Sequence, residues 1–538
     1  MDSGIWHKNW RERLPDVLAR EWDIVVIGGG ITGAGILLEA ARNGLKALLV
    51  EQRDFAWGAS SRSSKLVHGG LRYLRQGHLM LTRDSVGERQ DLLDNAAGLV
   101  EPQSFAFPHY RRQAPSRWLL SLGLGLYDLI AGKRSARYWG GDDFMLVAPH
   151  IRQTELQGGS CFGDAKTDDA RLTMRVLHEA IDAGGLAVNY LTASELLRSG
   201  QRVDGVVLVD GIGGASYRVH AKAVINATGA WADKLRGEVG AQPKLRPLRG
   251  SHLLLPAWRL PLAQAISLMH PRDGRPVFAY PWEGVSLVGT TDVDHRVDLD
   301  KEASISAHEV AYLMEALEFQ FPHLGLGLND IIATYAGVRP VIDHGRADPS
   351  KEDRDHAVWL EDGLLSVTGG KLTTFRLIAL DVLKRVAPLL PEWRATPQKT
   401  PFFKPASALP ATPTLNGRQR RRLQGRYGER AAALVQAAEP GELATITGSE
   451  TLWAELRWAA RAEAVCHLED LLLRRTRLGL QLRNGGADIL PRIRAICRHE
   501  LGWNENKWEA EQFAYTSLWD RCYALPSRAT IPDWRHAA

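Results

Sequence analysis

The sequence predicts an α/β protein with three parts: a parallel-sheet nucleotide-binding domain, an antiparallel-sheet substrate domain and a C-terminal all-helical domain. Three observations lead to this prediction. A glycine-rich turn stands between a short apolar strand and a helix near the start of the chain. The middle of the chain has strand patterns interrupted by prolines, as at sheet edges and turns. Residues 416–538 show helical patterns only.

Composition bounds the class of protein. The 538 residues exceed what one compact core accommodates, and 45% hydrophobic with 24% charged residues excludes wholesale disorder. The four cysteines are too far apart for a zinc knuckle or a C-x-x-C pair, so we expect a reduced, cytoplasmic setting. A net charge of +5 suits an anionic ligand or membrane surface and does not require nucleic acid. No run of 18 apolar residues occurs, so no membrane-spanning helix is expected.

The first unit of the predicted sheet follows an N-terminal extension of residues 1–22. Residues 23–27 (DIVVI) form an apolar strand, residues 36–41 a helix, and residues 46–50 (KALLV) a second strand. A strand–helix–strand unit of this length is typical of a parallel sheet. We therefore expect a Rossmann-type unit beginning at residue 23.

A dinucleotide fingerprint lies inside this unit. Gly28, Gly30 and Gly33 form G-x-G-x-x-G, in which the glycines allow a tight turn, close approach to a pyrophosphate and close helix packing. Glu51 ends the second strand, where a carboxylate would bind a ribose hydroxyl. This site alone does not separate NAD from FAD.

Two later segments favour FAD. Residues 224–229 (VINATG) are a strand that ends at Gly229, and residues 364–374 (LLSVTGGKLTT) are a strand that enters a turn at Gly369 and Gly370. A helix start after such a turn would face the flavin and stabilise its reduced form.

The rest of the chain divides where its composition changes. We expect the FAD-binding domain to span residues 23–400, with the substrate domain interleaved at roughly 79–160 and 245–335. A proline-rich linker over 401–415 leads to the helical domain at 416–538, whose first helix is rich in arginine. That helix is interpreted as a solvated face or as a lipid or partner contact.

Eight stretches, read together, resemble a known family, the FAD-dependent glycerol-3-phosphate dehydrogenases of the respiratory, aerobic type. They are IGGGITGAGI (27–36), SSKLVHGGLRYL (63–74), DDARL (168–172), NATGAWAD (226–233), RGSHLLLP (249–256), VGTTDVD (288–294), YAGVRPV (335–341) and VTGGKLTTFR (367–376). The resemblance implies oxidation of sn-glycerol 3-phosphate to dihydroxyacetone phosphate by hydride transfer from C2 to FAD N5, with electrons passed to a membrane quinone.

The resemblance and the chemistry of a phosphate dianion together indicate the substrate site. Arg72, Arg339 and Lys371 lie in the matching motifs, and arginine binds two phosphate oxygens at once. Arg354 is a further candidate from a charged stretch, and Tyr73 could donate a hydrogen bond.

For the proton acceptor we favour His252, with His68 as the alternative, because imidazole titrates near working pH. His252, Arg339 and Lys371 are thus the predicted catalytic set. Ser61 and Ser64 belong to a loop predicted to contact the cofactor, which also holds Ser60, Ser63 and Lys65. Asp292 is expected to orient groups of the pocket, and no cluster has metal-ligand spacing, so no metal is predicted.

A membrane contact is expected at residues 118–131 (WLLSLGLGLYDLIA), an apolar segment with basic flanks, and residues 6–18 are a second candidate. We therefore expect a protein attached peripherally to the inner face of the cell membrane, and we allow for a homodimer. The alternatives are a glycerol-3-phosphate oxidase that uses oxygen and another FAD-dependent amine or hydroxy-acid oxidoreductase of the same fold. A nucleic-acid-binding flavoprotein would need a base-stacking or reader motif, and we find none.

Overall fold

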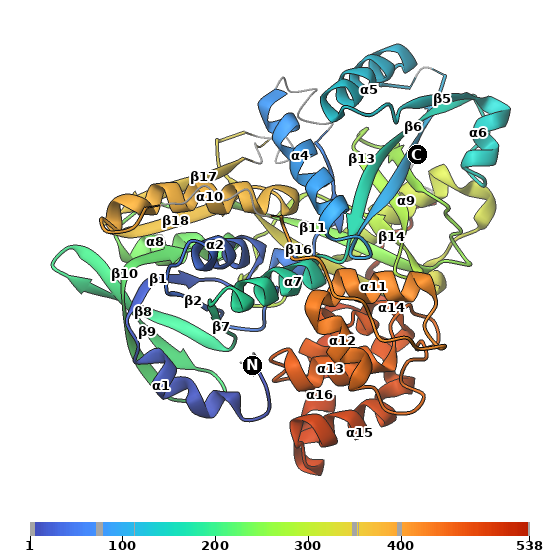
Figure 1. Cartoon of the computed structure of the whole chain (residues 1–538). Helices are drawn as coiled ribbons and strands as arrows, with labels where there is room; N and C mark the ends of the chain where they lie inside the picture. Colours follow the sequence, from blue (N-terminus) through green and yellow to red (C-terminus); the bar gives the residue numbers. More distant parts are fainter. Residues whose placement is uncertain are drawn as a thin grey trace.

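The computed structural model describes residues 6–70, 79–111, 113–346, 352, 355–394 and 401–535. Two large sheets and a separate group of helices make up the chain (Figure 1). In Figure 1 the C-terminal helices, in orange and red, lie at the lower right.

The first sheet holds the glycine-rich turn. Its order is β17 (His356–Glu361), β18 (Leu364–Gly369), β10 (Ser216–Asn226), β1 (Trp22–Ile27), β2 (Ala47–Val50) and β7 (Leu186–Val188). The strands from β18 to β7 are parallel, whereas β17 runs antiparallel at the edge. The residues of β2 are all buried, as expected for a parallel strand covered on both faces.

Helices cover one face of this sheet. Helix α2 (Ile31–Arg42) packs between α7 (Asp169–Asp182) and α10 (Phe375–Val386), and their apolar side chains share one core with the strands. The hairpin of β8 (Leu191–Ser199) and β9 (Arg202–Asp210) covers the other face together with α1 (Leu14–Leu18).

The second sheet is almost entirely antiparallel, with one parallel pair between β12 and β4. Its main order is β15 (Val293–Asp294), β11 (Leu245–Pro256), β14 (Val285–Gly289), β13 (Pro276–Trp282), β12 (Ala265–Met269), β4 (Val100–Tyr110), β6 (Leu156–Thr167) and β3 (Leu66–Val67). Strand β16 (Ala333–Ile342) also pairs with β11, and β5 (Arg137–Gly140) pairs with β6. Helix α9 (Ala307–Gln320) packs on β11 and β12, and its start is capped by Ser306 and Glu309.

Two helices stand at the top of Figure 1, away from the C-terminal helices: α4 (Leu79–Asn95) and α5 (Arg117–Ala131). Helix α4 ends at Asn95, and residues from Val100 onward pair with β6. The short helix α6 (Gly141–Val147) follows β5.

The described part of the N-terminal extension, residues 6–22, is part of the fold. Trp6, Leu14 and Leu18 are buried, and the Trp6 indole donates to the carbonyl of Ala187. The interpretation of residues 6–18 as a second membrane contact is therefore wrong, because its apolar side chains cover the first sheet.

The C-terminal region contains α11 (Gly417–Tyr427), α12 (Ala431–Gln436), α13 (Trp453–Ala462), α14 (Leu478–Gln481), α15 (Leu490–Leu501) and α16 (Glu505–Cys522). On α11, Arg422 and Arg426 are buried, and each pairs with Glu283 of the antiparallel sheet. The interpretation of this helix as a solvated face or a lipid contact is wrong for these two arginines, which join the helical region to the rest of the chain.

Within the described residues, no helix is both long enough and apolar enough to cross a membrane.

Candidate active site

The glycine-rich turn joins β1 to α2. Gly28 has a φ of +116°, and a Cβ there would lie 2.5 Å from the carbonyl oxygen of Ala227. Gly30 is the N-cap of α2. A Cβ on Gly33 would lie only 2.0 Å from the Gly28 carbonyl oxygen. The turn is thus packed against the start of the helix as closely as backbone allows, which suits a pyrophosphate bound by N–H groups.

This packing gives a first prediction. Gly33→Ala should lower the free energy of unfolding by about 1–3 kcal/mol and abolish FAD retention, because the methyl group overlaps backbone. The matched control is Gly87→Ala in the interior of α4, where a Cβ meets nothing within 4 Å. It should raise stability by about 0.5–1 kcal/mol. Thermal unfolding and flavin absorbance per chain check both variants, and normal flavin content in Gly33→Ala would contradict the role of the turn.

Glu51 stands at the end of β2, beside the turn. Its carboxylate accepts hydrogen bonds from the N–H of Gly29 at 2.7 Å and of Arg53 at 2.9 Å. Burial raises the pKa of this carboxyl above its usual range. The side chain thus lies beside the glycine-rich turn, and its contact with a ribose stays a prediction.

The serine segment, residues 60–69, runs from the nucleotide turn to the second sheet. The Ser60 hydroxyl caps α2 by accepting from the N–H of Ile31 at 2.9 Å. The carbonyl of the buried Ser61 accepts from Lys65 and from Arg477 of the C-terminal region. Ser63 donates to Asp169 through both its N–H and its hydroxyl. The segment is thus fixed along its length by groups that lie far away in the sequence.

Lys65 is an anchor beneath this segment. Its ammonium is fully buried and lies 2.9 Å from Asp169, and burial lowers its pKa to about 8. It also lies over the rings of Trp282 and Tyr335. The expectation that Lys65 contacts the cofactor is wrong, because its charge is already paired in the core.

His252 meets the serine segment on the second sheet. Register places it on β11 opposite Tyr335 of β16, and the two rings stack at 4.5 Å. Its Nε2 lies 2.9 Å from the Ser64 hydroxyl, whereas its Nδ1 is buried and has no hydrogen-bond partner within the described chain. Burial, followed by the charges of Arg339 and Lys65, holds the pKa of His252 well below its usual range. The imidazole is therefore neutral and able to accept a proton.

Arg339 lies on the same strand as Tyr335. Its guanidinium donates to Asp292 at 2.9 Å and to the Thr290 hydroxyl at 3.0 Å, both in the segment after β14. Asp292 is buried and also pairs with Arg275 at 3.2 Å. Asp292 therefore holds the guanidinium of Arg339 in place.

The turns after β10 and β18 adjoin the nucleotide turn, because these strands and β1 are parallel neighbours and end at one edge. Gly229, Gly369 and Gly370 have φ values of +62°, +78° and +75°. The Thr368 hydroxyl donates to the Gly229 carbonyl at 3.2 Å, which joins the two turns.

Lys371 belongs to a second group, at the start of the helical turn Leu372–Thr374. Its ammonium lies 3.3 Å from the Ser85 hydroxyl of α4, and the Thr373 hydroxyl donates to the His68 carbonyl. The serine segment connects the two groups, since Ser64 meets His252 and His68 meets Thr373.

Three predicted substrate residues, Arg72, Tyr73 and Arg354, lie outside the described residues. In the part of the chain that is described, no three or more His, Cys, Asp or Glu side chains are placed to hold a metal ion.

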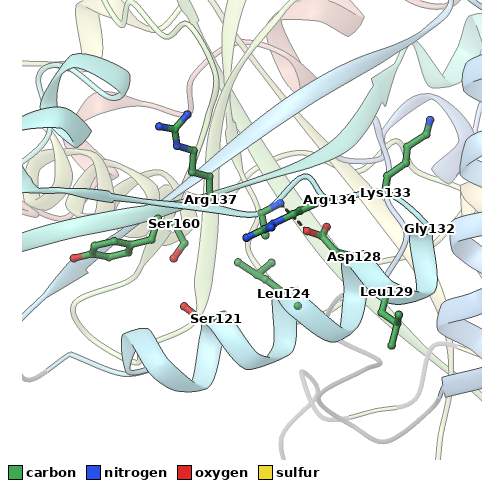
Figure 2. A pocket seen from close by; sticks show the side chains of 12 residues that line it. Ser121, Leu124, Asp128, Leu129, Gly132, Lys133, Arg134, Arg137 and Ser160 are labelled. Carbon is green, nitrogen blue, oxygen red and sulfur yellow. Dashed lines mark hydrogen bonds between the residues drawn. The ribbon is translucent and has the colours of Figure 1, made fainter.

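A cavity of about 600 Å³ lies apart from these groups, beside α5 (Figure 2). Its described lining includes Leu124, Asp128 and Arg134 and none of the predicted site residues. The Asp128 carboxylate accepts from the backbone N–H groups of Ser135 and Ala136, so it closes the turn between α5 and β5.

Comparison with known proteins gives the family. Residues 23–376 match the family described as FAD dependent oxidoreductase, and residues 403–508 match the C-terminal domain of alpha-glycerophosphate oxidase. An aerobic glycerol-3-phosphate dehydrogenase of Staphylococcus epidermidis is 38% identical over 375 residues, which are 68% of this chain and 67% of that protein. The chain belongs to the family of FAD-dependent glycerol-3-phosphate dehydrogenases and oxidases.

Two solved structures extend the family's likeness to the whole fold. The glycerol-3-phosphate dehydrogenase of Bacillus halodurans in complex with FAD has a TM-score of 0.75 at 26% identity and covers 96% of this chain and 98% of its own. The L-alpha-glycerophosphate oxidase of Mycoplasma pneumoniae with FAD bound has a TM-score of 0.58 at 16% identity, covers 72% of this chain and 98% of its own, and shows the shared fold alone. The predicted fold class and the predicted cofactor, FAD, are thus confirmed.

Two residues of the site were missed from the sequence. Asp169 and Tyr335 hold the serine segment, yet Asp169 is the first residue of a helix and Tyr335 stands in an apolar strand. A sequence signal was available for both, because Asp169 lies in the DDARL motif and Tyr335 is the first residue of the YAGVRPV motif.

Proposed function

We propose that this chain oxidises sn-glycerol 3-phosphate to dihydroxyacetone phosphate. The observation that carries the proposal is the pairing of β11 with β16, which brings the His252 imidazole and the Arg339 guanidinium to one part of the sheet, beside the serine segment. The names of the relatives, aerobic glycerol-3-phosphate dehydrogenases, support the same substrate.

The phosphate requires cations, because a phosphomonoester carries nearly two negative charges at neutral pH. Arg339 can offer its planar fork, already oriented by Asp292 and Thr290. Lys371 can add a second charge from the turn after β18. We propose that Arg72, Arg354 and Tyr73 also bind this phosphate.

The C2 hydroxyl requires a proton acceptor. A neutral imidazole can take the proton at Nε2, the nitrogen that meets the Ser64 hydroxyl. Arg339 then stabilises the negative charge that develops on the C2 oxygen. Bound FAD supplies the two-electron acceptor for the hydride that leaves C2. The residues that would hold FAD lie around one edge of the first sheet and in the serine segment that leaves this sheet. They are Gly28, Gly30, Gly33, Glu51, Ser61, Ser64, Gly229, Gly369 and Gly370.

Steady-state turnover tests this proposal. We expect oxidation of glycerol 3-phosphate to exceed that of glycerol, glycine and lactate by at least about 1,000-fold in kcat/KM, because each charged hydrogen bond to phosphate contributes about 1.5–3 kcal/mol. A preference for glycine or lactate would instead support the amine or hydroxy-acid alternative.

We infer that the electrons pass to a membrane quinone. A comparison of turnover with a soluble quinone analogue and with oxygen decides between the dehydrogenase and the oxidase alternative. Faster turnover with oxygen would overturn this inference.

We propose that helix α5 attaches the protein to the inner face of the membrane. One side of the helix exposes Trp118, Leu119, Leu122 and Leu129, which are between 62% and 77% accessible, whereas Leu124 and Tyr127 on the other side are buried. Exposed cations flank the helix at Arg111, Arg117, Lys133 and Arg134. An apolar face with basic ends suits the interface of an anionic bilayer.

The double variant Leu122→Gln/Leu129→Gln should weaken binding to vesicles with anionic phospholipids by about 100-fold or more, since about 3–6 kcal/mol of apolar burial is lost. Leu360→Gln on β17, a leucine 51% accessible elsewhere, serves as the control and should bind as the wild type does. Vesicle co-sedimentation measures both. If the double variant binds vesicles as tightly as the wild type, α5 is not part of the docking surface.

A further inference from the structure

Three buried side chains connect helix α5 to the serine segment. The guanidinium of Arg89, on α4, donates to the Tyr127 hydroxyl of α5 at 2.6 Å and to Asp164 of β6 at 3.0 Å. Asp164 in turn accepts from the backbone N–H of Gly69 at 3.0 Å. All three side chains are at least nine-tenths buried. We call Arg89, Tyr127 and Asp164 the Gly69 cluster.

The cluster fits closely around Gly69. A Cβ on Gly69 would lie 2.1 Å from the Tyr127 oxygen and 2.8 Å from Val86 of α4. Only glycine therefore fits against the tyrosine, and the end of the serine segment is held against α4 and α5 together.

The same turn borders the candidate active site. His68, next to Gly69, accepts from Thr373 in the turn that carries Lys371. Ser85, one helical turn before Arg89 on α4, lies 3.3 Å from the Lys371 ammonium. Arg72 follows Gly69 by three positions in the sequence. The Gly69 cluster thus adjoins the turn that carries Lys371, one of the cations proposed for phosphate binding.

We propose that Asp164, Arg89 and Tyr127 are positioning residues that fix the His68–Gly69 turn relative to Lys371 and so determine the affinity for the phosphorylated substrate. They do not touch substrate or cofactor; they act through the backbone of Gly69. This inference rests on the proposed function, since it assumes that the phosphate binds beside Lys371. Because Tyr127 belongs to α5, the helix with the exposed apolar face also helps to position the His68–Gly69 turn.

The expected pH dependence follows from the contacts of Asp164. Burial raises the pKa of Asp164 to about 6, against the opposing charge of Arg89. The ionisable groups that face it are Arg89 from α4 and Tyr127 from α5. Above pH 6 the carboxylate is charged and accepts from both Gly69 and Arg89. Below pH 6 it becomes protonated, these hydrogen bonds weaken, and the affinity for substrate should fall.

The test uses the FAD-loaded full chain and two conservative variants, Asp164→Asn and Tyr127→Phe. Asp164→Asn should raise the KM for glycerol 3-phosphate by about 10- to 100-fold, the effect of a lost charged hydrogen bond. Tyr127→Phe should raise it by about 3- to 10-fold. In both, kcat should change by less than about 3-fold, because the groups that meet the reacting atoms are intact. The control is Tyr312→Phe on α9, whose hydroxyl also donates to a carboxylate, Asp273, and which should match the wild type.

The pH profile distinguishes positioning from simple packing. The substrate phosphate itself ionises near pH 6, but that contribution is common to every variant. The ratio of kcat/KM between the wild type and Asp164→Asn should therefore rise from pH 5 to pH 7. A flat ratio, or an unchanged KM in both variants, overturns the inference. If Asp164→Asn fails to retain FAD, the KM of Tyr127→Phe decides. Failure of the wild type itself to turn over glycerol 3-phosphate would contradict the proposed function instead.

Discussion

Arg339→Ala should lower kcat/KM for glycerol 3-phosphate by about 1,000-fold while FAD stays bound. The guanidinium is held by Asp292 and Thr290, in the segment after β14, so we expect its loss to act on the substrate and to leave FAD bound. Two charged hydrogen bonds to phosphate, at about 1.5–3 kcal/mol each, account for an effect of this size. Glycerol, which lacks phosphate, should be oxidised equally poorly by the variant and the wild type.

Arg275→Ala is the matched control for this prediction. Arg275 also pairs with Asp292, at 3.2 Å, but it comes from the turn between β12 and β13. Its removal should cost less than about 10-fold in kcat/KM. Near-normal activity in Arg339→Ala, or an equal loss in both variants, would show that Arg339 does not bind the phosphate.

His252→Gln should lower kcat by about 100- to 10,000-fold, the range of general base catalysis, with FAD retained. Glutamine keeps a polar side chain opposite Tyr335, but it cannot take a proton near neutral pH. Burial and the nearby charges of Arg339 and Lys65 hold the pKa of His252 below its usual range, so the wild-type imidazole is neutral at pH 7. The kcat of the wild type should therefore fall only at acidic pH. The low kcat that remains in the variant should not fall in the same way.

His270→Gln provides the control, because His270 is also buried and also stacks on a tyrosine, Tyr312, at 3.6 Å. It lies outside the candidate site and should leave kcat within about 3-fold of the wild type. Single-turnover reduction of the flavin measures both variants. A wild-type rate in His252→Gln would show that another group is the base, and His68 is the alternative.

The nucleotide-binding half of the site could be predicted because its signals are local. Gly28, Gly33 and Glu51 stand within one strand–helix–strand unit, and each is required by backbone geometry that the spacing of the motif already implies. The capping box of Ser306 and Glu309 at the start of α9 is a local signal of the same kind.

The substrate half depends on long-range pairing, which periodicity does not encode. His252 and Arg339 come together only through the register of two strands, and the pairing of Arg339 with Asp292 follows from that register. Family motifs indicated these residues, but no local pattern indicates that Lys65 pairs with Asp169, 104 positions away.

Charged residues of the C-terminal region were the least predictable. A run of arginines on α11 is usually solvated, yet Arg422 and Arg426 are buried against Glu283. Arg477 likewise reaches the Ser61 carbonyl across the boundary with the nucleotide-binding sheet. Their partners belong to other domains, so no pattern within the helical region could reveal that they are buried.

The most direct test of the central claim is anaerobic mixing of the FAD-loaded protein with glycerol 3-phosphate, followed by flavin absorbance. We expect the absorbance near 450 nm to bleach within the dead time or the first seconds, with dihydroxyacetone phosphate formed in a 1:1 ratio to flavin, and we expect glycerol to cause no bleaching. A flavin that stays oxidised in the presence of saturating glycerol 3-phosphate would contradict the account.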